Sequence, residues 1–339
     1  MSGTPVVLIA FNRPEVTRRA FAAIREARPP RLFLVCDGPR ADRPGDAAGV
    51  SAVRALLDDV DWPCEVDRRF SERNLGVEAN VELGLDHIFS QVERAIVLED
   101  DCLADPTFFR YADQLLDRYA DDRRVWQVAG NGLGLSESLF HGSSYAFSAW
   151  ASVWGWATWG DRWRRHRELF PRMHAGTGDE APVRTAPVKL DNAGLVTISG
   201  RRHFVEAAAS DDAVTHGWDK QWWLSIMSEG GVCVTPAHSL VENVGFGEGA
   251  SHTVGSGVDY GVAQPMAFPL VHPEDVLVDV EVERELELIL NRVGGRTARL
   301  ARRLVRSPRM RRVLRSAADS RAATSLVRTL SRMNDRRSR

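Results

Sequence analysis

Short apolar segments alternate with helical patterns in the N-terminal part of the chain, and this alternation restricts the possible folds more than any other feature. The runs at residues 6–11, 32–36 and 95–98 are continuously apolar, as strands buried on both faces of a parallel sheet are. The pattern therefore predicts an α/β fold in which a mostly parallel sheet carries helices on both faces. Further strands are expected at residues 64–70 and 125–129, and helices from Pro14 onward and at residues 46–59, 76–89 and 107–119.

The later part of the chain differs in composition. Eight of the ten tryptophans lie between residues 140 and 260, among glycine-rich stretches. We expect one domain at residues 1–280, made of two halves, 1–135 and 136–280, with a glycine-rich lid loop at 245–257. From residue 281 the apolar spacing becomes helical and leads into an Arg-rich tail at 281–339.

Composition excludes several classes of protein. Four cysteines without a CxxC pair argue against a disulfide scaffold and against a structural zinc site. No run of 18 apolar residues could span a bilayer. The N-terminus lacks the basic region of a signal peptide. A cytoplasmic protein is therefore expected.

The net charge is −2, but the charged residues are distributed unevenly along the chain. Residues 291–339 hold 16 arginines against Asp319 and Asp335, a charge of +14, so the rest of the chain carries −16. Apolar residues interleave with these arginines, which is typical of helices that bind anionic membrane surfaces. A solvated tail that contacts the acidic body is the alternative, and nucleic-acid binding through the tail is a third interpretation.

Three adjacent carboxylates, Glu99, Asp100 and Asp101, follow the apolar run at residues 95–98. Their mutual repulsion is unfavourable unless a cation or a polar ligand compensates it. Carboxylate oxygens suit Mn²⁺ or Mg²⁺, which often bridge protein carboxylates to diphosphates. An exposed acidic turn is the alternative, but the buried strand before the triplet favours a binding site.

Other polar residues also follow predicted strands, where ligands of parallel sheets bind. Arg13 follows the first strand and precedes a helix, a place that favours anions; a solvated arginine is the alternative. Asp37 follows the second strand and could accept a hydrogen bond from a base or ribose, or serve only as a turn residue. Asn74 lies at another strand-to-helix turn and has the same two interpretations.

The second half offers a possible general base and aromatic platforms. Trp218 and Asp219 open an amphipathic helix, where partial desolvation would raise the pKa of Asp219. A carboxylate that merely favours the helix N-terminus is the alternative. Trp154 and Trp156 could stack on a sugar ring or pack in the core.

The glycine-rich segment after residue 244 could close over a ligand. Gly247 and Gly249 belong to a stretch with three glycines in five residues, and His252 near its end could reach a phosphate or a metal. A plain surface loop is the alternative.

Together these motifs resemble the GT-A nucleotide-sugar glycosyltransferases. More narrowly, the chain is similar to the inverting N-acetylglucosaminyltransferase I family and its bacterial relatives. The resemblance is carried by VLEDDCLADPTFF at residues 97–109, the aromatic stretch at 147–159, Trp218-Asp219 with Trp222, VCVTP at 232–236 and the Gly-His segment at 245–253. The family's WDDW becomes WDKQW here, so that Lys220 replaces a second acid.

The resemblance implies a role for each matching residue. Asp101 would coordinate Mn²⁺ (or Mg²⁺), Asp100 would contact the ribose and Glu99 the donor sugar. Arg13 and Asp37 would hold the nucleotide, and Asn74 and Trp218 would also belong to the donor-binding site. It also implies that 1–135 is a nucleotide-binding half and 136–280 an acceptor-binding half.

The resemblance further implies a reaction. Asp219 would deprotonate the acceptor hydroxyl, next to Trp218, while the segment at 245–257 closes over the donor. The chain would then be a metal-dependent inverting glycosyltransferase that moves a sugar from a nucleotide-diphosphate sugar, by resemblance a UDP-sugar, to a glycan or lipid-linked acceptor. Cell-surface polysaccharide synthesis by a bacterial, cytoplasmic enzyme, peripheral at the inner face of the plasma membrane, fits the charged tail.

Two rival functions stay open. A sugar-1-phosphate nucleotidyltransferase uses a similar sheet and metal, but needs a glycine-rich loop after the first strand, where this chain has Phe11-Asn-Arg-Pro-Glu. A non-enzymatic protein that binds nucleic acid or membrane through the tail would explain the arginines but neither the carboxylates nor the Trp218-Asp219 pair.

Overall fold

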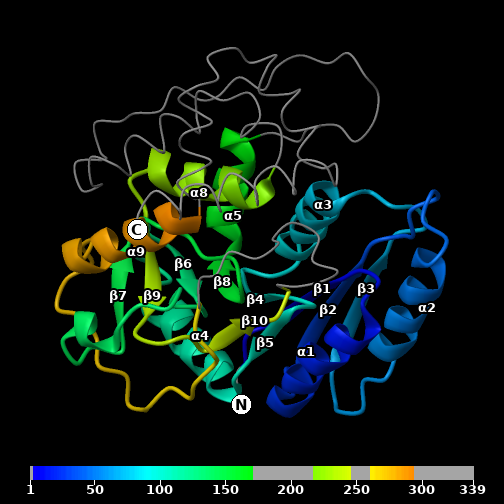
Figure 1. The fold of residues 1–339 in the computed structure, drawn as a ribbon, viewed down its shortest axis with the longest axis horizontal. Coiled ribbons are helices and arrows are strands. Elements are labelled where there is room, and N and C mark those ends of the chain that lie inside the picture. Colours follow the sequence, from blue (N-terminus) through cyan, green and yellow to red (C-terminus); the bar gives the residue numbers. More distant parts are fainter. Residues whose placement is uncertain (1–2, 171–216, 246–259, 294–339) are drawn as a thin grey trace, which may run out of the picture. The chain divides into compact units, whose positions relative to one another are not determined.

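The computed structural model describes residues 3–170, 217–245 and 260–293. An eight-stranded sheet in the order β3-β2-β1-β4-β8-β6-β9-β7 forms its centre (Figure 1). Six strands run in one direction, and β7 and β8 run in the other. The strands are β1 (Val6–Ala10), β2 (Arg31–Cys36), β3 (Glu65–Phe70), β4 (Arg94–Glu99), β6 (Val125–Ala129), β7 (Tyr145–Ser148), β8 (Trp156–Trp159) and β9 (Val232–Pro236). The predicted α/β class with a mostly parallel sheet is confirmed.

Helices follow the strands of the first half as the sequence pattern predicts. Each apolar run became a strand because it offers apolar side chains to both faces of the sheet. Pro14 stands at the first position of α1, where its missing N–H is tolerated. The Asp105 side chain caps the helix predicted at residues 107–119 by accepting from the Thr107 N–H at 2.8 Å. These helices are α1 (Pro14–Ala27), α2 (Asp46–Leu57), α3 (Val77–Phe89) and α4 (Pro106–Arg118).

The two faces of the sheet have separate apolar cores. Alternate residues of β1 divide between them: Val6 and Leu8 join the core that includes α1, α2 and α4, whereas Val7 and Ile9 join the core that includes α3. The second core also receives tryptophans from α5 (Gly160–Leu169) and α8 (Trp218–Ser228). This division explains why β1 has no polar position.

A second, two-stranded sheet was not predicted. It pairs β5 (Cys102–Ala104) with β10 (Val241–Asn243) in antiparallel fashion, so that Asn243 lies opposite Cys102. The first strand of this pair directly follows the acidic triplet. The small sheet therefore fixes the backbone on the C-terminal side of Asp101.

The C-terminal helix α9 (Val280–Val293) begins within the compact unit. Val282, Glu283 and Leu286 are buried, and the compact unit extends to Ile289. A short helix, η1 (Glu137–Phe140), completes the described elements. The Arg-rich segment 294–339 lies outside the described residues. In the described part of the chain, no helix has the length and apolar character that crossing a membrane requires.

A buried histidine should make stability depend on pH. His166 of α5 is fully buried, its Nδ1 lies 2.7 Å from Ser225 Oγ, and burial together with the Arg167 charge lowers its pKa to about 3. The fold favours the neutral ring. The stabilisation is therefore complete above the ordinary pKa of 6.5 and is lost as the pH falls below it.

We expect the free energy of unfolding to drop below pH ~6.5, by up to about 1.4 kcal/mol per pH unit from this group. Urea titrations between about pH 5 and pH 7 measure the slope. His166→Asn should flatten it, and replacing the exposed His141 serves as the control. An unchanged slope in His166→Asn would contradict this account of the ring.

Candidate active site

The carboxyl ends of β1, β2 and β4 meet at one edge of the sheet. β1 pairs in parallel with β2 on one side and β4 on the other, placing Ala10 opposite Cys36 and Ile9 opposite Glu99. Arg13, Asp37 and the acidic triplet follow these three strands. The parallel register therefore brings together residues that the sequence analysis selected separately.

Arg13 forms ion pairs with two members of the triplet. Its Nη2 donates to Asp100 Oδ1 and, at 2.9 Å, to Asp101 Oδ2. The other oxygen of Asp100 accepts the Phe11 N–H at 3.3 Å. Burial raises the pKa of Asp100, and the Arg13 charge limits this rise. Although burial acts in the opposite direction, the charges of Asp100 and Asp101 raise the pKa of Arg13 above its ordinary value.

Glu99 is the member of the triplet without a cationic partner in the described structure. Its side chain is half-buried, and burial together with the charges of Asp101, Asp100 and Asp219 raises its pKa to about 8. The carboxyl group is therefore mostly protonated at neutral pH and can donate a hydrogen bond. The contribution of Asp219 also shows that α8 brings a fourth carboxylate within electrostatic range of the triplet.

Asp219 lies in the first turn of α8 and is exposed. The expected desolvation of its carboxylate is therefore wrong. The apolar surroundings belong instead to its neighbours, because Trp218 and Trp222 are buried in the core. Trp218 is consequently a packing residue in the described structure, whereas Asp219 keeps a side chain that a substrate can reach.

The backbone after β10 covers Asp101. The Val244 N–H donates to the Asp101 carbonyl at 2.9 Å, and the Gly245 N–H donates to Asn243 Oδ1 at 2.7 Å. A Cβ at position 245 would clash with Asp101 Oδ2. A side chain at the first residue of the predicted lid would therefore have to displace the Asp101 carboxylate, whereas Gly247, Gly249 and His252 lie outside the described residues.

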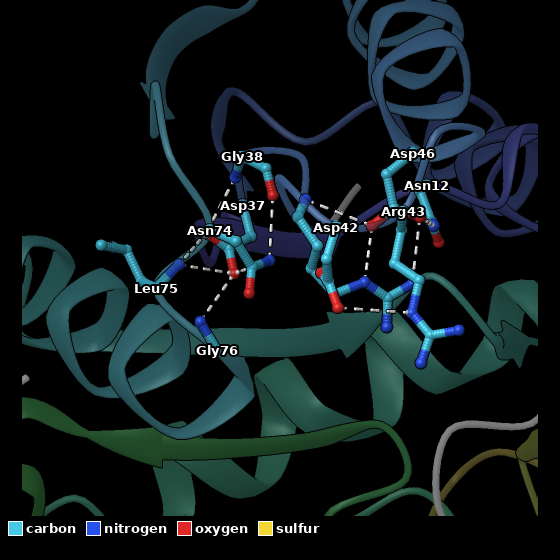
Figure 2. Close-up of polar contacts among 10 residues, drawn as sticks. Asn12, Asp37, Gly38, Asp42, Arg43, Asp46, Asn74, Leu75 and Gly76 are labelled. Atoms are coloured by element: carbon cyan, nitrogen blue, oxygen red, sulfur yellow. Dashed lines mark hydrogen bonds and ion pairs between the residues drawn. The ribbon is translucent and has the colours of Figure 1, made fainter.

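Asp37 ties together two loops at the same edge. Its Oδ1 accepts the N–H groups of Gly38 at 2.8 Å and Leu75 at 2.9 Å, and its Oδ2 accepts Asn74 Nδ2 at 2.9 Å and the Gly76 N–H at 3.0 Å. Figure 2 shows these bonds converging on the carboxylate. Burial raises the pKa of Asp37, and these N–H donors oppose the rise. The side chain holds the start of α3 against the end of β2, so its use in binding a base stays a prediction.

A second carboxylate that holds a loop at this edge by hydrogen bonds was not predicted from the sequence. Asp46, the first residue of α2, accepts Asn12 Nδ2 at 2.7 Å (Figure 2). It also accepts Nε, Nη2 and the backbone N–H of Arg40, at 2.5, 3.0 and 3.2 Å. The hydrogen bonds from Arg40 lower the pKa of Asp46 to about 2. The sequence signal for this role of Asp46 was an acidic residue at the start of a helix that follows a loop. Through its bond to Asn12, Asp46 fixes the loop after β1, and hence the backbone that carries Arg13.

The tryptophans divide between core and surface. Trp156 is fully buried and stacks on Trp218, with ring centroids 5.9 Å apart. Its predicted role in stacking on an acceptor is therefore wrong, because its faces are already covered. Trp154 is half-buried and meets Tyr260 edge-on at 4.8 Å. Its role as a platform stays a prediction.

The fit of a divalent cation can be tested against these contacts. Mn²⁺ and Mg²⁺ need several oxygen ligands around one point. Among the described residues, no three His, Cys, Asp or Glu side chains are grouped as such ligands. Arg13 already engages Asp100 and Asp101, and Gly245 covers the second of them. With Arg13 in this position the described residues offer no complete set of ligands to a divalent ion, and Mn²⁺ or Mg²⁺ at Asp101 stays a prediction.

No protein-family model matches the chain, and no curated protein matches it. Solved structures with some likeness include HddC from Yersinia pseudotuberculosis (10% identity, 51% of this chain and 81% of that chain, TM-score 0.31). The galactosyltransferase LgtC (13%, 68% and 73%, 0.34) and mouse xyloside xylosyltransferase 1 (10%, 67% and 82%, 0.34) are two others. All three likenesses are weak both in sequence and in structure.

Substitution of Gly245 tests the packing over Asp101. We expect Gly245→Ala to lower the free energy of unfolding by about 1–3 kcal/mol, the usual effect of forcing extra volume into a filled site. Chemical denaturation measures the change. Gly45→Ala is the matched control, because a Cβ there meets nothing within 4 Å. Equal stabilities of the two variants would contradict the close contact at Asp101.

Proposed function

We propose that the chain is a GT-A-type glycosyltransferase that moves a sugar from a nucleotide-diphosphate sugar to an acceptor hydroxyl. One observation carries the proposal: three carboxylates at the end of β4, the Arg13 guanidinium after β1 and the exposed Asp219 of α8 gather at the carboxyl edge of a parallel sheet. This edge is where ligands of such sheets bind.

Each group has a chemical task in such a transfer. Asp219 takes the proton of the acceptor hydroxyl as its oxygen attacks the anomeric carbon. The bond from that carbon to the diphosphate breaks on the opposite face, so the configuration inverts. Glu99, protonated at neutral pH, donates a hydrogen bond to a hydroxyl of the donor sugar. Among the described residues, Nε and Nη1 of Arg13 make no hydrogen bond, so they can receive the oxygens of the leaving diphosphate.

The finer assignments belong to the same proposal. A UDP-sugar donor, a glycan or lipid-linked acceptor and a place in surface-polysaccharide synthesis rest on the resemblance of residues 97–109 and 218–222 to the N-acetylglucosaminyltransferase I family. Attachment to an anionic membrane rests on the +14 charge of residues 291–339. The absence of glycine from Phe11 to Glu15 disfavours the nucleotidyltransferase alternative.

A panel of nucleotide-sugars tests the reaction class. We expect one donor to raise the melting temperature of the full chain, with and without added Mn²⁺, and to be hydrolysed or transferred slowly to a glycan acceptor. Chromatography of the nucleotide product measures turnover. Release of pyrophosphate from a nucleoside triphosphate and a sugar 1-phosphate would favour the nucleotidyltransferase and overturn the proposal.

Asp219→Asn tests the general base. We expect kcat to fall by roughly 10²–10⁴-fold while donor affinity stays unchanged, because the carboxylate acts on the acceptor and not on the donor. Lys220→Gln, the exposed neighbour in the same helix, is the matched control. Wild-type turnover by Asp219→Asn would remove this residue from the mechanism.

A further inference from the structure

One nitrogen of Arg13 serves two carboxylates. Nη2 contacts both Asp100 Oδ1 and Asp101 Oδ2. The side chains of these acids are only 4% and 15% exposed, and that of Arg13 is 27% exposed. The guanidinium is therefore held between two poorly hydrated carboxylates, where a charge-assisted contact is stronger than at an open surface.

Three of the four oxygens of these two acids are already engaged. Asp100 Oδ1 and Asp101 Oδ2 accept from Arg13, and Asp100 Oδ2 accepts the Phe11 N–H at 3.3 Å and lies 3.4 Å from Thr17 Oγ1. The fourth, Asp101 Oδ1, has the Cys102 thiol at 3.9 Å. A divalent ion held by both oxygens of Asp101, or by both acids, would have to compete with the guanidinium.

The position of Arg13 is built into the fold. Asn12, the residue before it, is bonded to Asp46, and Arg13 itself precedes Pro14 at the start of α1. The Arg13 carbonyl accepts both the N–H of Thr17 at 2.9 Å and its hydroxyl at 2.8 Å. The backbone is thus anchored on both sides, which restricts the positions that the Arg13 guanidinium can reach.

We propose that Arg13 is the counter-cation of the acidic edge: in the nucleotide-free chain its guanidinium takes the place of a divalent metal at Asp100 and Asp101, and excludes one. Arg13 is a positioning residue in this sense, since it sets the charge and the access of both carboxylates. This inference concerns metal binding in the absence of substrate, so it does not depend on the proposed glycosyl transfer.

Mn²⁺ binding to the full, nucleotide-free chain tests the proposal. Electron paramagnetic resonance of free Mn²⁺ gives the affinity without any activity assay. We expect Arg13→Gln to bind one Mn²⁺ at least about tenfold more tightly than the wild type, a difference of about 1.4 kcal/mol. Arg13→Gln with Asp101→Asn should lose this gain. Guanidinium ion added at low concentration should displace Mn²⁺ from Arg13→Gln, because it restores the missing group.

Two controls separate competition from net charge. Arg18→Gln removes an exposed arginine of the same helix, which pairs with Glu15, and should leave Mn²⁺ affinity within about twofold of the wild type. Equal gains in Arg13→Gln and Arg18→Gln would overturn the proposal. So would tight Mn²⁺ binding by the wild type that Asp101→Asn abolishes, a result that needs no Arg13 variant to fold. Failure of the donor panel alone would count against the proposed function and leave this inference standing.

Discussion

Three consecutive carboxylates at the end of a buried strand are stable together only if their charge is compensated, and in this chain much of that compensation comes from Arg13. The guanidinium neutralises Asp100 and Asp101, and the remaining member, Glu99, holds a proton at neutral pH instead. The repulsion among the three acids is therefore reduced in two ways, by ion pairs with Arg13 and by protonation of Glu99. They leave the site with one acid that can donate and two that are bound by an arginine.

The rest of the edge is organised so that this compensation is geometrically possible. β1 lies between β2 and β4 in parallel register, which places the loop carrying Arg13 beside the triplet. Asp37 and Asp46 then tie the neighbouring loops by accepting backbone and side-chain donors. Buried acids that accept several hydrogen bonds fix loops more firmly than apolar contacts alone, because losing any partner leaves a buried polar group unsatisfied.

The fold of the first half could be predicted because β1, β2 and β4 contain continuous apolar runs and the helices between the strands place apolar residues at helical spacing. β5 escaped prediction because a strand of three residues has no measurable periodicity. The site was predicted as a set of residues, but not as a set of contacts. Arg13 meets Asp100 only because β1 and β4 are neighbours, and Asp37 finds its donors in a loop that follows a third strand. Local sequence contains neither fact. Nor could it separate Trp156, which is fully buried, from the half-buried Trp154 two residues earlier.

The close approach of Gly245 to Asp101 links the identity of one residue after β10 to the acidic triplet. Because a Cβ at position 245 would meet Asp101 Oδ2, any larger residue there has to displace that carboxylate or the backbone beside it. Asn243, bonded to the Gly245 N–H and paired opposite Cys102, holds the neighbouring backbone in the small sheet. A residue that belongs to neither half of the acidic cluster thus limits the volume available around one of its oxygens.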